Sequence, residues 1–222
     1  PTVPHKEAAL AALAPFVVPP AERLQALNPI YRDPDTGEIR GTNTDGIGFW
    51  THLKKSVPDF SGKTAVVIGA GGAARAIVDV LETEGRMKVR LVNRTMARAA
   101  SLVADIEAKA MVYDWQQMPK ALEGADLVVN TTSLGMTGQA DLDIDLSPLP
   151  ATAVVYDIVY VPLETPLLRQ ARDRGLATVD GLGMLLWQAA PGFARWFGVE
   201  VTEDDVAAAR ALIEDDLKKE QG

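Results

Sequence analysis

The sequence predicts an α/β protein in which a Rossmann-like, doubly wound parallel sheet is joined to a smaller α/β domain. Two observations carry this prediction. From residue 63 onward, short β-branched runs alternate with stretches whose apolar residues recur at helical spacing, as the strands and crossover helices of a parallel sheet do. Before residue 63 the chain is interrupted by prolines and lacks this alternation, so it cannot be another turn of the same sheet.

The first region is predicted to contain a hairpin and a helix. The hairpin covers Tyr31–Arg40 around the turn residues Asp33–Gly37, and the helix covers Asp45–Lys55. Residues Val57–Gly62 then connect this region to the sheet. The prolines that interrupt the chain are Pro4, Pro15, Pro19, Pro20 and Pro29.

The second region is predicted to contain the sheet. Its strands are expected at Thr64–Ile68, Val89–Asn93, Leu127–Asn130, Ala153–Asp157 and Ala177–Asp180. Its crossover helices are expected at Ala73–Glu84, Met96–Ala108, Gln116–Leu122 and Thr165–Arg174. Two further helices, Leu182–Phe197 and Asp204–Lys218, are expected to pack back on the first region. The expected division is residues 1–54 for the smaller domain, 55–180 for the sheet domain and 181–222 for the C-terminal helices.

The composition argues against several classes of protein. The chain has 222 residues and a formal net charge of −8, which disfavours binding to nucleic acid or to an anionic membrane. No apolar run approaches the roughly 20 residues of a membrane-spanning helix, and no secretory leader is expected at the start. The absence of cysteine fits a reducing cytoplasm, and His5 and His52 alone make a zinc site improbable, so no metal is expected.

A glycine-rich turn follows the first predicted strand of the sheet. Residues Gly69, Ala70, Gly71, Gly72, Ala73 and Ala74 form a G-x-G-x-x-A pattern between a strand and a helix. Glycines there allow a tight turn and a close approach of the backbone to a pyrophosphate, while the helix N-terminus offers N–H groups and partial positive charge. The pattern predicts a dinucleotide site; the alternative is a turn that only connects two elements.

The end of the second predicted strand indicates which dinucleotide is bound. A site for NAD would place a carboxylate there, to accept hydrogen bonds from the ribose hydroxyls. Here the strand ends in Asn93, Arg94 and Thr95, and Arg98 follows one turn along the next helix. Because the two arginines can pair with a 2′-phosphate, NADP is the predicted cofactor. The alternative is that both arginines are ordinary solvated side chains.

A polar segment, Asn130–Met136, follows the third predicted strand. Open α/β sheets bind their ligands at the carboxyl ends of the strands, so Thr131 and Ser133 are candidates for the mouth of the cofactor crevice. A polar loop without a ligand remains the alternative.

These motifs together resemble those of the shikimate dehydrogenase family, in the order in which that family carries them. The resemblance covers essentially the whole chain. The matching segments are Val3–Glu7 (V-P-x-K-E), Gly41–Gly46 (G-x-N-T-D-G), Gly69–Ala76 (G-A-G-G-A-A-R-A), Asn93–Thr95, Asn130–Met136, Tyr156–Tyr160 with Glu164–Leu167, and Asp180–Leu185 with Gln188–Ala190.

The resemblance implies an NADP-dependent oxidoreductase that reduces 3-dehydroshikimate to shikimate in aromatic amino-acid biosynthesis. It assigns the catalytic pair to Lys6 and Asp45. It implies substrate contacts from Thr2, Lys6, Asn28, Asp45, Tyr160 and Gln188. It adds Ile158, Gly181 and Met184 to the cofactor contacts named above. Taken singly, Lys6 is more typical of an exposed lysine, and Asp45 of a helix N-cap.

Three departures from the family pattern are visible. Pro29 follows Asn28 where threonine is usual, and Trp187 is bulkier than expected just before Gln188. The family's upstream strands and its Ser-x-Ser motif, which binds the substrate carboxylate, are not in this sequence. We therefore expect an incomplete substrate domain.

Two alternatives stay open. One is a quinate/shikimate dehydrogenase or a paralogue that acts on another hydroxy acid; an NAD enzyme of this kind is disfavoured by Arg94. The other is a dinucleotide-binding module without catalysis. The expected partner is a small-molecule substrate, not nucleic acid or a membrane, and the oligomeric state is left open, a homodimer included.

Overall fold

The computed structural model describes residues 6–57, 60 and 62–220. The side chains of Lys6, Glu7 and Glu220 lie outside this description. The site predictions for Thr2 and for the side chain of Lys6 therefore fall outside the described part of the chain.

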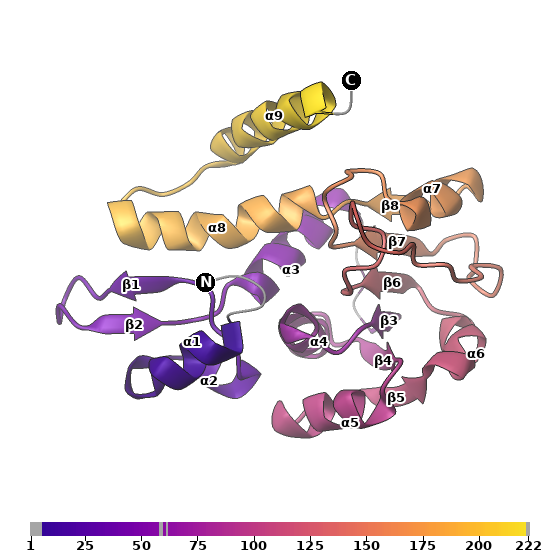
Figure 1. The fold of residues 1–222 in the computed structure, drawn as a ribbon, viewed down its shortest axis with the longest axis horizontal. Helices are drawn as coiled ribbons and strands as arrows, with labels where there is room; N and C mark the ends of the chain where they lie inside the picture. Colours follow the sequence, from indigo (N-terminus) through magenta and orange to yellow (C-terminus); the bar gives the residue numbers. More distant parts are fainter. Residues whose placement is uncertain (1–5, 58–59, 61, 221–222) are drawn as a thin grey trace.

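The second region folds into a six-stranded parallel sheet with the order β5-β4-β3-β6-β7-β8 (Figure 1). The strands are β3 (Thr64–Ile68), β4 (Lys88–Asn93), β5 (Met111–Asp114), β6 (Leu127–Asn130), β7 (Val154–Asp157) and β8 (Ala177–Val179). The chain starts at the central strand β3, builds outward on one side, and then returns to build the other side from β6. This is the doubly wound order, and the predicted fold class is confirmed.

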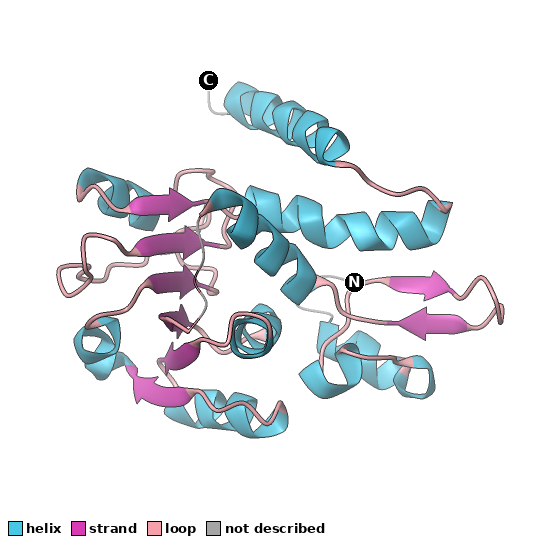
Figure 2. Cartoon of the chain, turned by 180° about the vertical axis from the view of Figure 1, so that it is seen from behind, coloured by secondary structure: helices cyan, strands magenta, loops and turns pink. Residues whose placement is uncertain are grey.

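Helices cover both faces of this sheet (Figures 1 and 2). One face packs against α4 (Gly72–Thr83) and α5 (Met96–Asp105), through a core that includes Val67, Ile77 and Leu102. The other face packs against α6 (Met118–Leu122), α7 (Pro166–Asp173) and the loop between β6 and β7, whose Leu142, Ile144, Leu146 and Leu149 are buried. The strands read as continuous apolar runs because the sheet is buried on both faces.

The first region contains α1 (Lys6–Ala12), the short 3-10 helix η1 (Ala14–Phe16), α2 (Ala21–Leu24), the antiparallel strands β1 (Ile30–Arg32) and β2 (Ile39–Gly41), and α3 (Asp45–Ser56). The predicted hairpin is confirmed. Its turn is held by Asp33 Oδ1, which accepts hydrogen bonds from the backbone N–H groups of Asp35 and Thr36. Aspartate favours such turns because its side chain reaches the backbone two residues ahead.

The C-terminal helix α8 (Leu182–Phe197) packs on α3 and β1, and α9 (Glu203–Glu220) packs on α8. Glycines let α3 and α8 approach closely. A Cβ atom on Gly48 would lie 2.6 Å from Cβ of Gln188, and one on Gly183 would lie 2.1 Å from Nε2 of His52. Both distances are too short for any side chain, so this crossing requires glycine on each helix.

Two local predictions were incomplete. Strand β5 was not predicted, because it is a four-residue edge strand whose Met111 is exposed. The helix expected at Gln116–Leu122 begins as a 3-10 turn, η2 (Trp115–Gln117), and becomes α6 only at Met118. A capping box between Asp114 and Gln117 sets that start.

Within the described ranges, no helix is long and apolar enough to cross a membrane.

Candidate active site

The glycine-rich turn between β3 and α4 has the geometry of a phosphate-binding turn. Gly69 has a φ of +110°, and a Cβ atom there would lie 2.7 Å from Thr131 Oγ1, so only glycine fits. Gly71 is the N-cap of α4, and a Cβ atom there would meet no atom within 4 Å. The space above the helix N-terminus is therefore open to an anionic group, and the residues fit a dinucleotide pyrophosphate.

This geometry predicts that one substitution affects NADPH binding and another affects thermal stability. Gly71→Val should weaken NADPH binding at least about tenfold, or about 1.4 kcal/mol, because its side chain fills the space above the helix. Its melting temperature should stay close to that of the native chain, since the Gly71 backbone is extended and the position is exposed. Gly69→Ala should instead lower the melting temperature, because the alanine is strained and clashes with Thr131. Calorimetry with NADPH and thermal unfolding distinguish the two, and unchanged NADPH affinity in Gly71→Val would contradict the assignment.

The end of β4 places two arginines at the same edge of the sheet as this turn. The amide nitrogen of Asn93 donates to the backbone oxygen of Thr95 at 2.8 Å, and Thr95 is the N-cap of α5. Arg94 and Arg98 are exposed, and neither forms an ion pair with another described side chain. Both guanidinium groups are thus available to an anionic ligand.

A buried polar network joins the ends of β6 and β7. Asn130 donates its amide N–H to Asp157 Oδ1 at 2.9 Å, and Thr165 donates its hydroxyl to Asp157 Oδ2 at 2.7 Å. Thr131 donates its hydroxyl to the backbone oxygen of Ile68 at 2.8 Å, which ties this edge to β3. Burial raises the pKa of Asp157 to about 6, although its three hydrogen bonds act in the opposite direction.

The raised pKa predicts a pH-dependent stability. Because the folded pKa of Asp157 lies above its ordinary value of 3.8, its contribution to the free energy of unfolding is full below pH 3.8 and is lost as the pH rises through about 6. We expect the native chain to lose roughly 1.4 kcal/mol relative to Asp157→Asn between pH 5 and pH 7.5. Urea unfolding of both proteins across this range measures the difference, and a constant difference would rule out the shifted pKa.

The remaining predicted cofactor contacts lie around the same end of the sheet. Ser133 is exposed in the segment after β6, and Ile158 donates its backbone N–H to the Asn130 backbone oxygen at 3.1 Å. Gly181 precedes α8, and a Cβ atom there would lie 2.1 Å from the Ile158 backbone oxygen, so the two segments are in close contact. Met184 is buried in the first turn of α8.

At the start of α3, residues far apart in the sequence meet in a second polar cluster. The amide nitrogen of Asn28 donates to Asp45 Oδ1 at 3.0 Å and to Gln188 Oε1 at 2.7 Å. Asp45 is almost completely buried. The structure therefore brings together Asn28, Asp45 and Gln188, three of the predicted substrate-binding residues.

Three details of the structure bear on alternatives that the sequence left open. Asp45 is not the N-cap of α3; it is the first helical residue, and Thr44 precedes it as the cap. Pro29 does not disturb Asn28, because the Pro29 backbone oxygen accepts a hydrogen bond from Thr42 and Asn28 N–H donates to the Thr42 oxygen. Trp187 lies beneath Lys55, whose Nζ is 5.1 Å from the ring centroid, so its ring packs against α3.

One member of this cluster was not singled out in the sequence. Thr44 is buried, its hydroxyl donates to the Gln188 backbone oxygen at 2.8 Å, and its backbone N–H donates to Asn28 Oδ1 at 2.9 Å. It links α3, α8 and the segment before β1. In the sequence, only its position within the Gly41–Gly46 motif pointed to Thr44, because its partner Gln188 lies more than a hundred residues away.

Tyr160 lies half-buried on the loop after β7, and no hydrogen bond within the described part of the chain links it to this cluster. Lys6 is the first residue of α1. Among the described residues, no group of three or more His, Cys, Asp or Glu side chains is placed to hold a metal ion.

Comparison with known proteins gives consistent matches. A sequence profile described as Shikimate / quinate 5-dehydrogenase matches residues 51–137. The chain is 55% identical over 201 residues to a shikimate dehydrogenase (NADP(+)) of Methylobacterium radiotolerans, and the match covers 89% of this chain and 71% of the relative.

Solved structures agree with this match. The chain resembles the shikimate 5-dehydrogenase of Thermus thermophilus in complex with NADP(H) and shikimate, with a TM-score of 0.80 at 36% identity, over 95% of this chain and 77% of that one. It also resembles a quinate dehydrogenase of Corynebacterium glutamicum in complex with NAD, with a TM-score of 0.85 at 33% identity, over 96% of this chain and 76% of that one.

Proposed function

The chain belongs to the family of shikimate and quinate 5-dehydrogenases, and from this premise we propose that its cleft reversibly reduces 3-dehydroshikimate to shikimate with NADPH. One observation supports the proposal most. The first turn of α3, which carries Asp45, touches α4 one turn beyond the glycine-rich turn: a Cβ atom on Gly46 would lie 3.1 Å from the Ala76 backbone oxygen. The polar cluster and the open helix N-terminus are thus neighbours, as a hydride transfer between two ligands requires.

The cofactor is proposed to lie across the carboxyl edge of the sheet. Gly69, Ala70, Gly71, Gly72 and Ala73 would hold the pyrophosphate, and Asn93, Arg94, Thr95 and Arg98 the ribose and its 2′-phosphate. Thr131, Ser133, Ile158, Gly181 and Met184 would surround the nicotinamide. When bound, NADPH supplies the hydride that adds to the ketone carbon.

The proton is proposed to come from the chain itself. Lys6 would donate it to the ketone oxygen during reduction and take it back from the hydroxyl in the reverse reaction. Asp45 would orient the lysine ammonium and hold a substrate hydroxyl. Because Asn28 fixes both Asp45 Oδ1 and Gln188 Oε1, the Gln188 amide nitrogen remains a donor for the substrate. Thr2 and Tyr160 would complete the substrate contacts.

The contacts between elements favour the proposed division of the chain. Residues 1–54 with the helices of 181–222 would form the substrate side, and residues 55–180 the NADP side. The contact of α8 with α3 and β1 supports this grouping. We place the reaction in aromatic amino-acid biosynthesis and, from the absence of cysteine, in the cytoplasm. Sedimentation velocity would decide between a monomer and a homodimer.

The test is an absorbance assay of cofactor oxidation that crosses NADPH and NADH with 3-dehydroshikimate and 3-dehydroquinate. The proposal expects the highest kcat/KM for NADPH with 3-dehydroshikimate. Faster turnover of 3-dehydroquinate with NADH would instead favour the activity of the Corynebacterium relative. Binding of NADPH without turnover of either ketone would identify a dinucleotide-binding module.

A further inference from the structure

Asp157 ends β7 with a fully buried carboxylate that accepts from three separate segments. Asn130 lies at the end of β6, Val159 N–H donates to Asp157 Oδ1 at 3.0 Å from the following loop, and Thr165 lies at the start of α7. A carboxylate is suited to this arrangement because both oxygens accept and neither donates. A buried charge is costly, so the three donors that surround it are needed to offset its burial.

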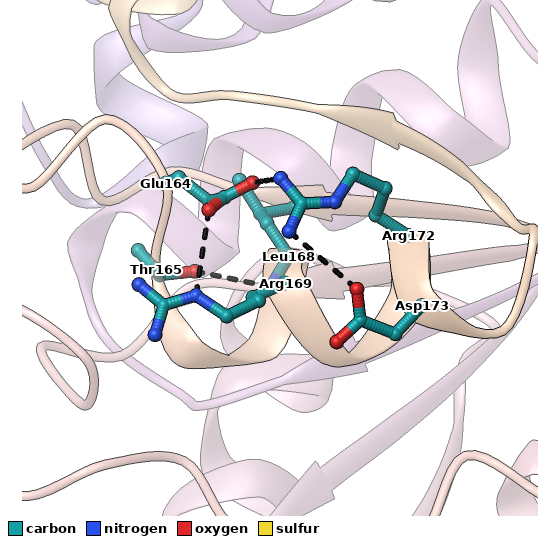
Figure 3. Close-up of polar contacts among 6 residues, drawn as sticks. All are labelled: Glu164, Thr165, Leu168, Arg169, Arg172 and Asp173. Atoms are coloured by element: carbon teal, nitrogen blue, oxygen red, sulfur yellow. Dashed lines mark hydrogen bonds and ion pairs between the residues drawn. The ribbon is translucent and has the colours of Figure 1, made fainter.

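Two of these hydrogen bonds, from Val159 and Thr165, fix the two ends of one loop, residues 158–165. Val159 holds its start. Thr165 holds its end, and the same hydroxyl caps α7 by accepting from Leu168 N–H at 3.3 Å (Figure 3). Glu164, on the solvent side of the loop end, pairs with Arg169 and Arg172 of α7. The Val161 backbone oxygen also accepts from Thr137 N–H at 2.9 Å, so the middle of the loop is held by the segment after β6.

This loop carries Ile158 and Tyr160, and its first residue touches the start of α8, the helix that carries Gln188: a Cβ atom on Gly181 would lie 2.1 Å from the Ile158 backbone oxygen. Its position relative to the sheet is set by a group that lies outside the ligand contacts proposed above. Misplacement of a reacting or binding group by about 1 Å can lower a rate by around 10²-fold.

We propose that Asp157 is a positioning residue for hydride transfer: its carboxylate, through Val159 and Thr165, fixes the loop that carries Tyr160. The inference rests on the proposed function, because it concerns the geometry of that reaction. Asp157 acts through the loop and does not touch either ligand.

The first test compares Asp157→Asn with Thr165→Val and Thr165→Ser. Asparagine places an amide N–H₂ against a donor, and valine removes the hydroxyl, so both should lower kcat for 3-dehydroshikimate about 10- to 100-fold. Serine keeps the hydroxyl and should retain kcat within about threefold. NADPH affinity should change less than about threefold in all three. Glu164→Gln, which removes only the exposed ion pairs, is the matched control and should leave kcat unchanged.

A double-mutant cycle separates positioning from general stability. If Asp157 acts through the loop of Tyr160, the losses in Asp157→Asn and Tyr160→Phe should be less than additive when combined. Fully additive losses, or kcat within twofold of native in both Asp157→Asn and Thr165→Val, would overturn the proposal. If Asp157→Asn does not fold, the valine and serine variants of Thr165 decide.

A native chain that does not reduce 3-dehydroshikimate refutes the proposed function itself. The assay of the unmutated protein shows this before any variant is compared.

Discussion

Replacing Lys6 by alanine should lower kcat for 3-dehydroshikimate reduction by about 10²–10⁴-fold, the usual contribution of a general acid. Hydride addition leaves negative charge on the ketone oxygen, and without a proton donor beside it the alkoxide must be protonated by water. The dissociation constant for NADPH should change less than about twofold, because Lys6 begins α1, outside the sheet domain that carries the glycine-rich turn. Steady-state kinetics and calorimetry with NADPH measure the two quantities.

The control for this variant is Lys120→Ala, on the exposed side of α6. It removes the same charge from a helix on the opposite face of the sheet and should leave kcat unchanged. If Lys6→Ala retains more than about a tenth of native turnover, Lys6 is an ordinary surface lysine and the proton comes from another group.

The second large effect is expected at Arg94. Arg94→Ala should weaken NADPH binding by about 1.5–3 kcal/mol, or roughly 10- to 150-fold, because a charge-assisted hydrogen bond to the 2′-phosphate is lost. NADH has no phosphate at that position, so its affinity should stay within about twofold of the native value. The ratio of the two dissociation constants, measured by calorimetry, isolates the phosphate contact from any general damage to the site.

Lys88→Ala is the matched control for Arg94, because Lys88 is an exposed cation at the start of β4, whereas Arg94 directly follows the end of that strand. It should preserve the preference for NADPH. Equal affinities of the native chain for NADPH and NADH would refute the role of Arg94 before any variant is made.

The sheet was largely predictable from the sequence because strands buried on both faces appear as unbroken apolar runs. Strand β5 was missed in the sequence because it is an edge strand, paired only with β4, and its first residue, Met111, faces solvent. The glycine-rich turn was also predictable, because the positive φ of Gly69 and the close approach of Thr131 allow only glycine at this position, and that glycine is visible in the sequence.

The meeting of Asn28, Asp45 and Gln188 was not predictable from spacing. It depends on how α3 crosses α8, and this crossing is set by Gly48 and Gly183, whose close contacts leave no trace in a hydrophobic pattern. Only the family motifs pointed to these three residues. The role of Asp157 was hidden for a similar reason, because its partners Asn130 and Thr165 come from different elements.

The central claim is that this cleft transfers a hydride from NADPH to 3-dehydroshikimate. The most direct measurement uses NADPH in which both hydrogens at the nicotinamide C4 position are deuterium, followed by mass spectrometry and NMR of the product. The account predicts shikimate with one deuterium bound to the ring carbon that was the ketone. Product without deuterium, or no shikimate at all under conditions in which NADPH is bound, would contradict it.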